Sequence, residues 1–214
     1  MRTIERGELD LSELNKPKNK ELSQYRLNLE NSAIQCGEVV LVNLGSYFQT
    51  FSKFDAKKTN SDHFVLFFVK RRGYGFFPPI WHDADFGFVL TKPNRNWITK
   101  RFSKKTIRDT AIACIGFNVD DMLNPSVCTV VQIQGVRGKE CDLMSFKWER
   151  MLVKLAIDWA RGMGVKTMKV VMSVNQRWYY ESKKDSFYMK YDVTARRSGF
   201  KLNPQEKIYF LELN

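Results

Sequence analysis

Histidine and cysteine are scarce in this sequence. Its 214 residues include two histidines, His63 and His82, and four cysteines, and no two cysteines follow a C-x-x-C spacing. So few His and Cys residues argue against a zinc site, because such sites draw several ligands from these two residue types. The same scarcity argues against a disulfide-linked fold and favours a reducing compartment. We therefore expect no metal centre and a cytoplasmic location.

Long apolar segments are missing as well. The longest strongly apolar run covers about residues 63–69, whereas a membrane-spanning helix needs about 20 apolar residues. Residues 1–20 are polar, contain Lys-Pro-Lys, and lack the apolar core of a signal peptide. We expect a flexible basic arm over residues 1–20, a single domain over residues 21–214, and no association with a membrane.

Aromatic residues and positive charge are plentiful. Apolar residues make up 43% of the chain and aromatic residues 14%, which is enough for a sizeable core. Lys and Arg number 35 against 23 Asp and Glu, giving a net charge of +12. Such an excess attracts polyanions, including nucleic acids and phosphorylated cofactors. It is also what a solubilising surface looks like, so charge alone does not identify a partner.

The second half of the chain alternates between strand and helix patterns. Residues 127–134 favour a strand, 144–161 a helix, 167–174 a strand, 185–198 a helix and 207–213 a closing strand. This alternation predicts an α/β layer architecture.

The most regular of these patterns is the helix at residues 144–161. Its apolar residues recur at spacings of three and four, which predicts one buried face and one polar face. The inward positions are Met144, Trp148, Met151, Leu152, Leu155 and Trp159. The outward positions are Lys147, Arg150, Lys154, Asp158 and Arg161. We expect this helix to be a core element.

The first half carries less regular patterns. Strands are predicted at residues 37–44, 63–72 and 86–90, and helices at 18–35 and 103–118. The inward residues of the second helix are predicted to be Ile107, Ala111, Ile112 and Ile115.

The stretch VVQIQGVRGKECDLM joins a predicted strand to the predicted core helix. Gly135 and Gly138 lie in the connection. A glycine-containing loop that leads into a helix can hold a phosphate with its backbone N–H groups and with the positive end of the helix dipole. It can equally be a plain connection between two packed elements, and the residues alone leave both interpretations open.

The order of elements over residues 127–213 resembles the C-terminal half of the GNAT superfamily of N-acetyltransferases. Strand, glycine loop, long amphipathic helix, Gly-x-Gly turn, strand, helix, Gly199-Phe200 and a final strand follow one another as they do in that family. The resemblance implies a mixed, largely antiparallel central sheet flanked by helices on both faces. It also implies acetyl-CoA or another acyl-CoA as cofactor and an amine as acceptor.

The resemblance further implies a set of cofactor-binding residues. In the family, one strand opens away from its neighbour to receive the pantetheine arm, and the following loop holds the pyrophosphate. Matched positions in this chain are Ile133, Gln134, Gly135, Val136, Arg137, Gly138, Lys139 and Asn175. The family loop reads Q/R-x-x-G-x-G/A, whereas the fourth residue here is Arg137 when counted from Gln134 and Glu140 when counted from Arg137.

The resemblance also points to a tyrosine as the general acid. The family's tyrosine usually lies four residues before the Gly-Phe pair, and Ala195 occupies that place. Tyr191 and Tyr188 lie one and about two turns earlier, and we take them as the candidate catalytic residues. Alternatively, Tyr191 packs between a helix and the sheet with only its hydroxyl at the edge.

Two functions are therefore expected as alternatives. The first is a GNAT-type acyltransferase that moves an acetyl or other acyl group from acyl-CoA to an unknown amine acceptor. The second is a catalytically degenerate binding protein of the same fold that holds nucleic acid or a protein partner on its basic surface. The altered loop would also permit a donor other than free coenzyme A.

Three other motifs admit both functional and structural interpretations. His82-Asp83-Ala84-Asp85 suits a general base or a weak metal site, or else an exposed loop. Gly73-Tyr74-Gly75, after Lys70-Arg71-Arg72, suits an anion or base contact, or else a tight turn. Arg196-Arg197 suits a phosphate clamp, or else a solvated helix face.

Overall fold

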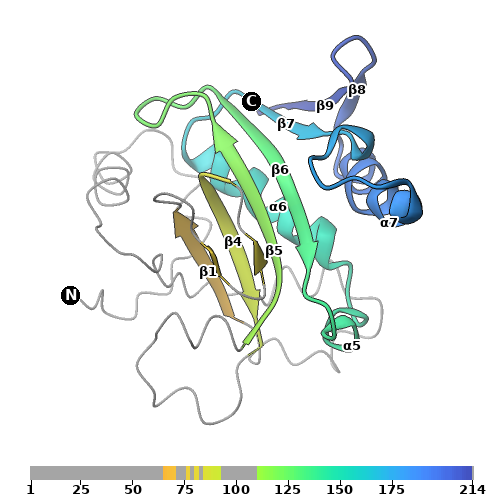
Figure 1. Ribbon diagram of the computed structural model, residues 1–214. Helices are drawn as coiled ribbons and strands as arrows, with labels where there is room; N and C mark the ends of the chain where they lie inside the picture. Colours follow the sequence, from red (N-terminus) through yellow and green to blue (C-terminus); the bar gives the residue numbers. More distant parts are fainter. Residues whose placement is uncertain (1–64, 71–75, 78–79, 82–83, 93–109, 214) are drawn as a thin grey trace, which may run out of the picture.

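A computed structural model describes residues 65–70, 76–77, 80–81, 84–92 and 110–213 (Figure 1). The arm predicted at 1–20, the helix at 18–35 and the strand at 37–44 lie outside the described residues. Seven strands form one sheet in the order β1-β4-β5-β6-β7-β9-β8. Their bounds are β1 Val65–Lys70, β4 Phe86–Thr91, β5 Ala111–Val119, β6 Val127–Gly135, β7 Thr167–Val171, β8 Lys201–Asn203 and β9 Ile208–Glu212. A separate pair consists of β2 Phe76–Phe77 and β3 Ile80–Trp81.

The sheet is mixed, with one parallel pair. β6 and β7 run parallel, and every other neighbouring pair is antiparallel. The parallel pair is a consequence of chain order, because a helix crosses over between β6 and β7. The expected mixed α/β fold is confirmed. Helices on the second face of the sheet stay a prediction, since the helix expected at 18–35 lies outside the described residues.

The helix predicted at residues 103–118 is wrong from Ala111 onward. Ala111–Val119 is the central strand β5, and all of residues 111–117 are buried. A strand covered on both faces has no polar alternation, so its apolar residues fit a helical spacing as well as an extended one. Neighbours β4 and β6 occupy both of its edges, which satisfies its backbone groups in the extended form.

The core helix is present and begins later than its apolar pattern predicts. A short helix, α5 Glu140–Leu143, precedes α6 Trp148–Gly162, whose ribbon lies behind the sheet in Figure 1. Trp159 is buried, with its ring centroid 4.7 Å from that of Phe117 on β5. Two inward–outward assignments are wrong. Met144 precedes α6 and is 64% exposed, whereas Asp158 is buried beside Lys154, with which it forms an ion pair.

A helical stretch follows β7 and precedes the last two strands. It comprises η3 Ser173–Asn175, η4 Glu181–Lys183, α7 Lys184–Tyr188, the π-helix η5 Met189–Val193 and α8 Thr194–Arg197. Residues 184–197 are thus continuously helical, which confirms the helix predicted at 185–198. β7 ends at Val171, so the strand predicted at 167–174 is three residues too long, and Val174 is exposed.

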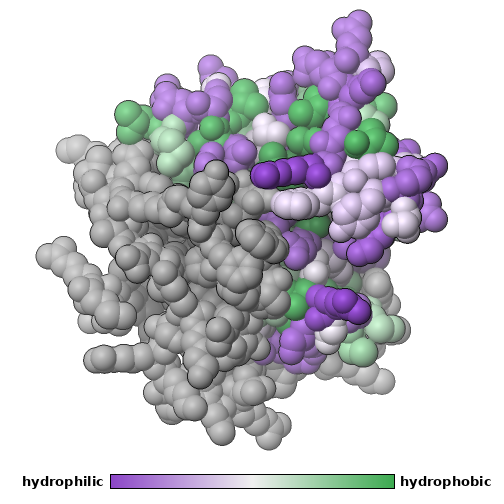
Figure 2. Space-filling view, viewed as in Figure 1, coloured by the Kyte–Doolittle hydropathy of each residue, from purple (hydrophilic) through white to green (hydrophobic). Residues whose placement is uncertain are grey.

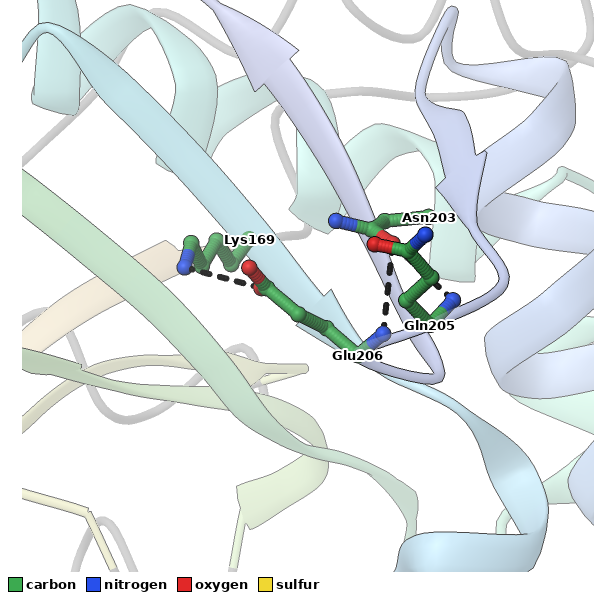
Figure 3. Close-up of polar contacts among 4 residues, drawn as sticks. All are labelled: Lys169, Asn203, Gln205 and Glu206. Carbon is green, nitrogen blue, oxygen red and sulfur yellow. Dashed lines mark hydrogen bonds and ion pairs between the residues drawn. The ribbon is translucent and has the colours of Figure 1, made fainter.

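The turn between β8 and β9 is held by side chains (Figure 3). The Asn203 Oδ1 atom accepts backbone N–H bonds from Gln205 at 3.0 Å and Glu206 at 3.2 Å. The Lys169 ammonium on β7 lies 3.4 Å from the Glu206 carboxylate. These contacts join the turn to β7, and an Asn side chain that accepts backbone N–H bonds is typical of tight turns.

Within the described ranges, no helix is long and apolar enough to cross a membrane. The same part of the chain holds no group of three or more His, Cys, Asp or Glu residues placed to bind a metal. Cys114 and Cys128 are buried free thiols, and Cys141 is an exposed one.

Candidate functional site

β6 and β7 pair at their beginnings and then diverge. Their parallel pairing covers four residue pairs, from Val127 with Thr167 to Val130 with Val170. Residues 131–135 of β6 have no pairing partner among the described residues of β7. Figure 1 shows the two ribbons separating from this point. We call this feature the β6–β7 divergence.

A β-bulge lies at the start of the divergence. Phe117 of β5 pairs with Val130, while the preceding Gly116 pairs with Gln132, so Val131 is an extra residue in β6. A bulge bends its strand and increases the local twist, which turns β6 away from the line of β7. Gly116 permits the close packing here, because a Cβ at this position would lie 2.9 Å from the Ala84 Cβ and 3.1 Å from the Gln132 Oε1.

The Tyr191 hydroxyl occupies the open edge of β6. The Ile133 N–H donates to the Tyr191 Oη at 2.9 Å, and both residues are buried. Burial raises the pKa of Tyr191 to about 12, so the hydroxyl stays protonated at neutral pH. Since the oxygen accepts the backbone bond, the hydroxyl proton is still available for donation. The Tyr191 ring stacks on Phe187, with centroids 6.0 Å apart.

Asp192, the next residue, contacts the other side of the divergence. Its carboxylate accepts the Ser173 N–H at 3.0 Å, directly beyond β7, and the Tyr209 hydroxyl at 3.2 Å. Consecutive residues of π-helix η5 therefore bind β6 and the end of β7. Irregular π-turns of this kind are frequent at functional sites. Asp192 was not predicted from the sequence, because the π-helix and the tertiary contacts that define its role have no local sequence signal.

The loop after β6 is held by one backbone bond to β5 and by bonds within itself. The Val136 N–H donates to the Ile112 carbonyl at 2.8 Å, and the Lys139 N–H donates to the Val136 carbonyl at 3.1 Å. Gly138 has a φ of 82°, a left-handed conformation that favours glycine. Its N–H donates to the Glu140 carboxylate at 3.1 Å. The loop therefore makes a tight turn at Gly138, and the Glu140 carboxylate accepts the backbone N–H that a bound anion could otherwise accept.

The charge of Glu140 is stabilised in this position. Its own N–H, the Gly138 N–H and the nearby Arg137 lower the pKa of the Glu140 carboxyl. The loop leads into the four-residue α5 and not directly into α6. Backbone donors and the neighbouring Arg137 and Lys139 would suit a pyrophosphate once Glu140 turned away. Because Glu140 is exposed, that turn breaks only solvated contacts.

The other candidate residues have separate contacts. The Gln132 side-chain amide donates to the Gln134 Oε1 at 2.8 Å. Gly135 faces Leu143 and Trp148, and a Cβ added there would lie 3.3 Å and 3.4 Å from their side chains. Asn175 is exposed and donates to the Lys207 carbonyl at 3.2 Å, which ties it to the β8–β9 turn.

Tyr188 lies on the surface. The Arg196 guanidinium donates to its hydroxyl and also lies over its ring, 5.2 Å from the centroid. The structure thus brings Tyr191 to Ile133 at the divergence and places Tyr188 in a surface pair with Arg196.

Part of the remaining motifs lies outside the described residues. His82, Asp83 and residues 73–75 are among these. Asp85 is exposed, and its N–H donates to the Asn118 side chain at 2.9 Å. Arg197 is exposed too, and its carbonyl accepts from Arg150 at 3.4 Å.

Ile133, Tyr191 and Asp192 form the strongest candidate site in the described part of the chain. An open strand edge, a protonated hydroxyl and a buried carboxylate meet where two parallel strands separate. Comparison of the sequence with protein-family models gave no match, and comparison with curated proteins gave none either.

Proposed function

We propose that the protein is an acyltransferase of the GNAT type, which transfers an acetyl or other acyl group from acyl-CoA to an amine. The observation that carries the proposal is the β6–β7 divergence with the Tyr191 hydroxyl at the Ile133 N–H. An unpaired strand edge binds an extended ligand that carries amides, because its backbone groups offer donors and acceptors at regular spacing. The pantetheine arm of coenzyme A is such a ligand.

Each part of the site has a role in this scheme. The cofactor supplies an acyl group activated as a thioester. Apart from the Ile133 N–H, which Tyr191 engages, the edge of β6 at residues 131–135 holds the arm in an extended form. The amine nitrogen bonds to the acyl carbon as the carbon–sulfur bond breaks, and Tyr191 donates its Oη proton to the departing sulfur as a general acid does. The proton that the amine loses passes to solvent, which restores the Tyr191 hydroxyl. Asp192 holds the end of β7 away from β6 through the Ser173 N–H.

The loop imposes a condition on donor binding. Glu140 accepts the Gly138 N–H that a phosphate oxygen would otherwise accept, and like charges would repel. The proposal therefore requires the Glu140 side chain to turn away when a phosphate-bearing donor binds. Arg137 and Lys139, which flank Gly138, favour the anion after that turn.

Calorimetric titration with acetyl-CoA, supported by thermal unfolding, tests the proposal. A ligand that binds only the folded state stabilises it by about 2.7 kcal/mol at a hundredfold excess over its Kd. ATP is the matched control, because it carries phosphates but no pantetheine arm. Heat and a thermal shift with acetyl-CoA beyond those with ATP support the proposal. Absence of both at millimolar acetyl-CoA contradicts it.

A second candidate function is a binding protein on the same fold that has lost catalysis. The Glu140 contact favours it, because a carboxylate at Gly138 is unfavourable for a resident pyrophosphate. Under this alternative, acetyl-CoA gives no heat while a polyanion still binds the basic surface with an affinity that falls steeply with salt.

A further inference from the structure

Residues 176–197 combine aromatic and basic side chains at unusual density. This segment joins β7 to β8 and contains six aromatic residues and six basic ones. The aromatic residues are Trp178, Tyr179, Tyr180, Phe187, Tyr188 and Tyr191. The basic residues are Arg177, Lys183, Lys184, Lys190, Arg196 and Arg197.

Three of the rings lie at the surface. Trp178 is 52% exposed, Tyr180 48% and Tyr188 43%. Large aromatic side chains are normally buried, and three exposed within 11 residues mark a contact surface. Figure 2 shows pale side chains of intermediate hydropathy beside strongly hydrophilic ones on this side of the molecule, over α7 and the loop before it.

A positively charged side chain lies over each exposed ring. The Arg177 guanidinium lies 5.2 Å from the Trp178 ring centroid, and the Lys183 ammonium lies 5.3 Å from that of Tyr180. Arg196 lies 5.2 Å from the ring centroid of Tyr188. Each flat π surface therefore has a positive charge beside it, a combination that suits a ligand made of bases and phosphates.

One of the three exposed rings, Tyr180, is anchored to the protein core through Phe187. Phe187 contacts Tyr179 and Tyr180 edge-on, with centroids 5.7 Å and 5.9 Å away. On its other side Phe187 stacks on the buried Tyr191. A ring fixed in this way loses little conformational entropy on binding.

Acidic residues offset only part of the positive charge. Asp192 is buried and engaged by Ser173 and Tyr209. Glu181 accepts the Tyr179 hydroxyl at 2.8 Å and pairs with Lys184 at 3.3 Å, and Asp185 is exposed on α7. Six cations against two surface carboxylates leave a field that attracts an anion.

We propose that this surface binds single-stranded nucleic acid. Bases stack on Trp178, Tyr180 and Tyr188, and backbone phosphates lie beside Arg177, Lys183 and Arg196. A duplex does not fit, because its bases are already stacked on one another. An acidic peptide would use the cations but leave the rings unused. This inference specifies the partner of the second candidate function, and it does not depend on acyl transfer.

Fluorescence anisotropy with labelled 12-nucleotide oligothymidylate and oligouridylate, on the full chain without any acyl donor, tests this. We expect binding of one or both strands, weakened at least about fivefold by Trp178→Ala and by Tyr180→Ala, since each stacked base contributes roughly 1–3 kcal/mol. Tyr180→Phe retains the ring and should bind as the unaltered protein does. Leu123→Ala, an exposed apolar residue on the β5–β6 turn, is the matched control and should change nothing.

Charge is tested separately from stacking. Neutralising about three phosphates predicts a salt slope near −2, so that raising salt from 50 to 200 mM weakens binding by about 20-fold. Arg177→Ala should reduce that slope, whereas Lys166→Ala, which alters an exposed lysine just before β7, should not.

An abasic oligonucleotide or polyglutamate that binds as tightly as oligothymidylate would overturn the proposal, because charge alone would then suffice. Absent binding, or equal weakening by Leu123→Ala, would overturn it too. A positive acetyl-CoA titration alongside such failure would leave the acyltransferase proposal standing.

Discussion

Tyr191 is a buried residue whose hydroxyl contacts the open edge of β6. Its ring packs on Phe187, and its oxygen accepts the Ile133 N–H, while burial keeps its proton in place at neutral pH. A tyrosine that merely filled space would need only the ring. The hydroxyl at an open strand edge is what makes the residue a candidate acid.

Tyr191→Phe separates these two roles. The ring and its stacking are retained, but the proton donor is lost, and the Ile133 N–H loses its acceptor. We expect turnover to fall by about a hundredfold, a typical contribution of general acid catalysis, with a much smaller change in KM. Thiol release from acetyl-CoA, with lysine methyl ester as the amine probe, measures both. Tyr180→Phe is the control, and unchanged turnover in Tyr191→Phe would remove the residue from the mechanism.

Glu140→Gln tests whether a carboxylate restricts the loop. The amide retains the size of the side chain but has no negative charge to repel a phosphate or to hold the Gly138 N–H as strongly. We expect acetyl-CoA to bind about two- to fivefold more tightly, the range of a single screened surface interaction. Acetylpantetheine, which lacks the pyrophosphate, should bind Glu140→Gln and the unaltered protein equally. Equal affinities of both proteins for acetyl-CoA would show that Glu140 does not compete with the cofactor.

The buried thiol of Cys114 makes the protein less stable as the pH becomes alkaline. Burial raises the pKa of this thiol from 9.0 to about 12, so the native state holds the proton more tightly than the unfolded chain. The resulting stabilisation is complete below pH 9 and is lost as the pH rises from 9 to about 12. We expect unfolding free energy to fall by up to about 1.4 kcal/mol per pH unit more in the unaltered protein than in Cys114→Ala. Urea unfolding between pH 8 and 11 measures the difference.

The control for that measurement is Cys141→Ala, which alters an exposed thiol and should leave the slope unchanged. Tyr191 acts in the same direction over pH 10 to 12, because burial raises its pKa as well. Parallel curves for Cys114→Ala and the unaltered protein would mean that the thiol is not buried in solution.

Among the elements, α6 was the most predictable and β5 the least. α6 lies on one face of the sheet, so buried and solvated positions alternate along its sequence. The helical spacing of its apolar residues can therefore be recognised. β5 is buried on both faces and has no polar alternation, so nothing in its sequence distinguishes a strand from a helix. The divergence after Val130 depends on a bulge between the consecutive strands β5 and β6 and on where β6 stops pairing with β7. Such a feature has no local signal.

A pair of methionines tests where α6 begins. Met144 and Met151 share the predicted apolar face, yet Met144 precedes the helix and is exposed, while Met151 is fully buried. Met151→Ala should cost about 2–5 kcal/mol, because it removes buried contacts and leaves a cavity. Met144→Ala should change stability by less than about 0.5 kcal/mol. Urea unfolding of the two variants measures this, and equal losses would place the start of the helix earlier than the structure does.

At the scale of the whole molecule, the sheet has two parts joined by a short ladder. β1, β4, β5 and β6 form one part and β7, β9 and β8 the other, with four parallel residue pairs between them. The π-helix η5 reinforces this junction through Tyr191 and Asp192. The sequence predicted the order of these elements from residue 127 onward, but the contacts across the junction required the structure, since they depend on tertiary register and not on local pattern.

The two proposed binding surfaces meet at this junction, and hydrogen exchange can separate them. Acetyl-CoA should slow amide exchange over residues 131–140, where the open strand edge and the loop lie. Oligothymidylate should slow it over residues 176–188, because its contacts fall on the aromatic and basic side chains. Peptide-level exchange of the full chain with each ligand in turn measures both effects. Residues 120–126, the β5–β6 turn, serve as the internal reference. Protection by acetyl-CoA confined to residues 176–188 would mean that its phosphates bind the basic surface and that β6 is not its site.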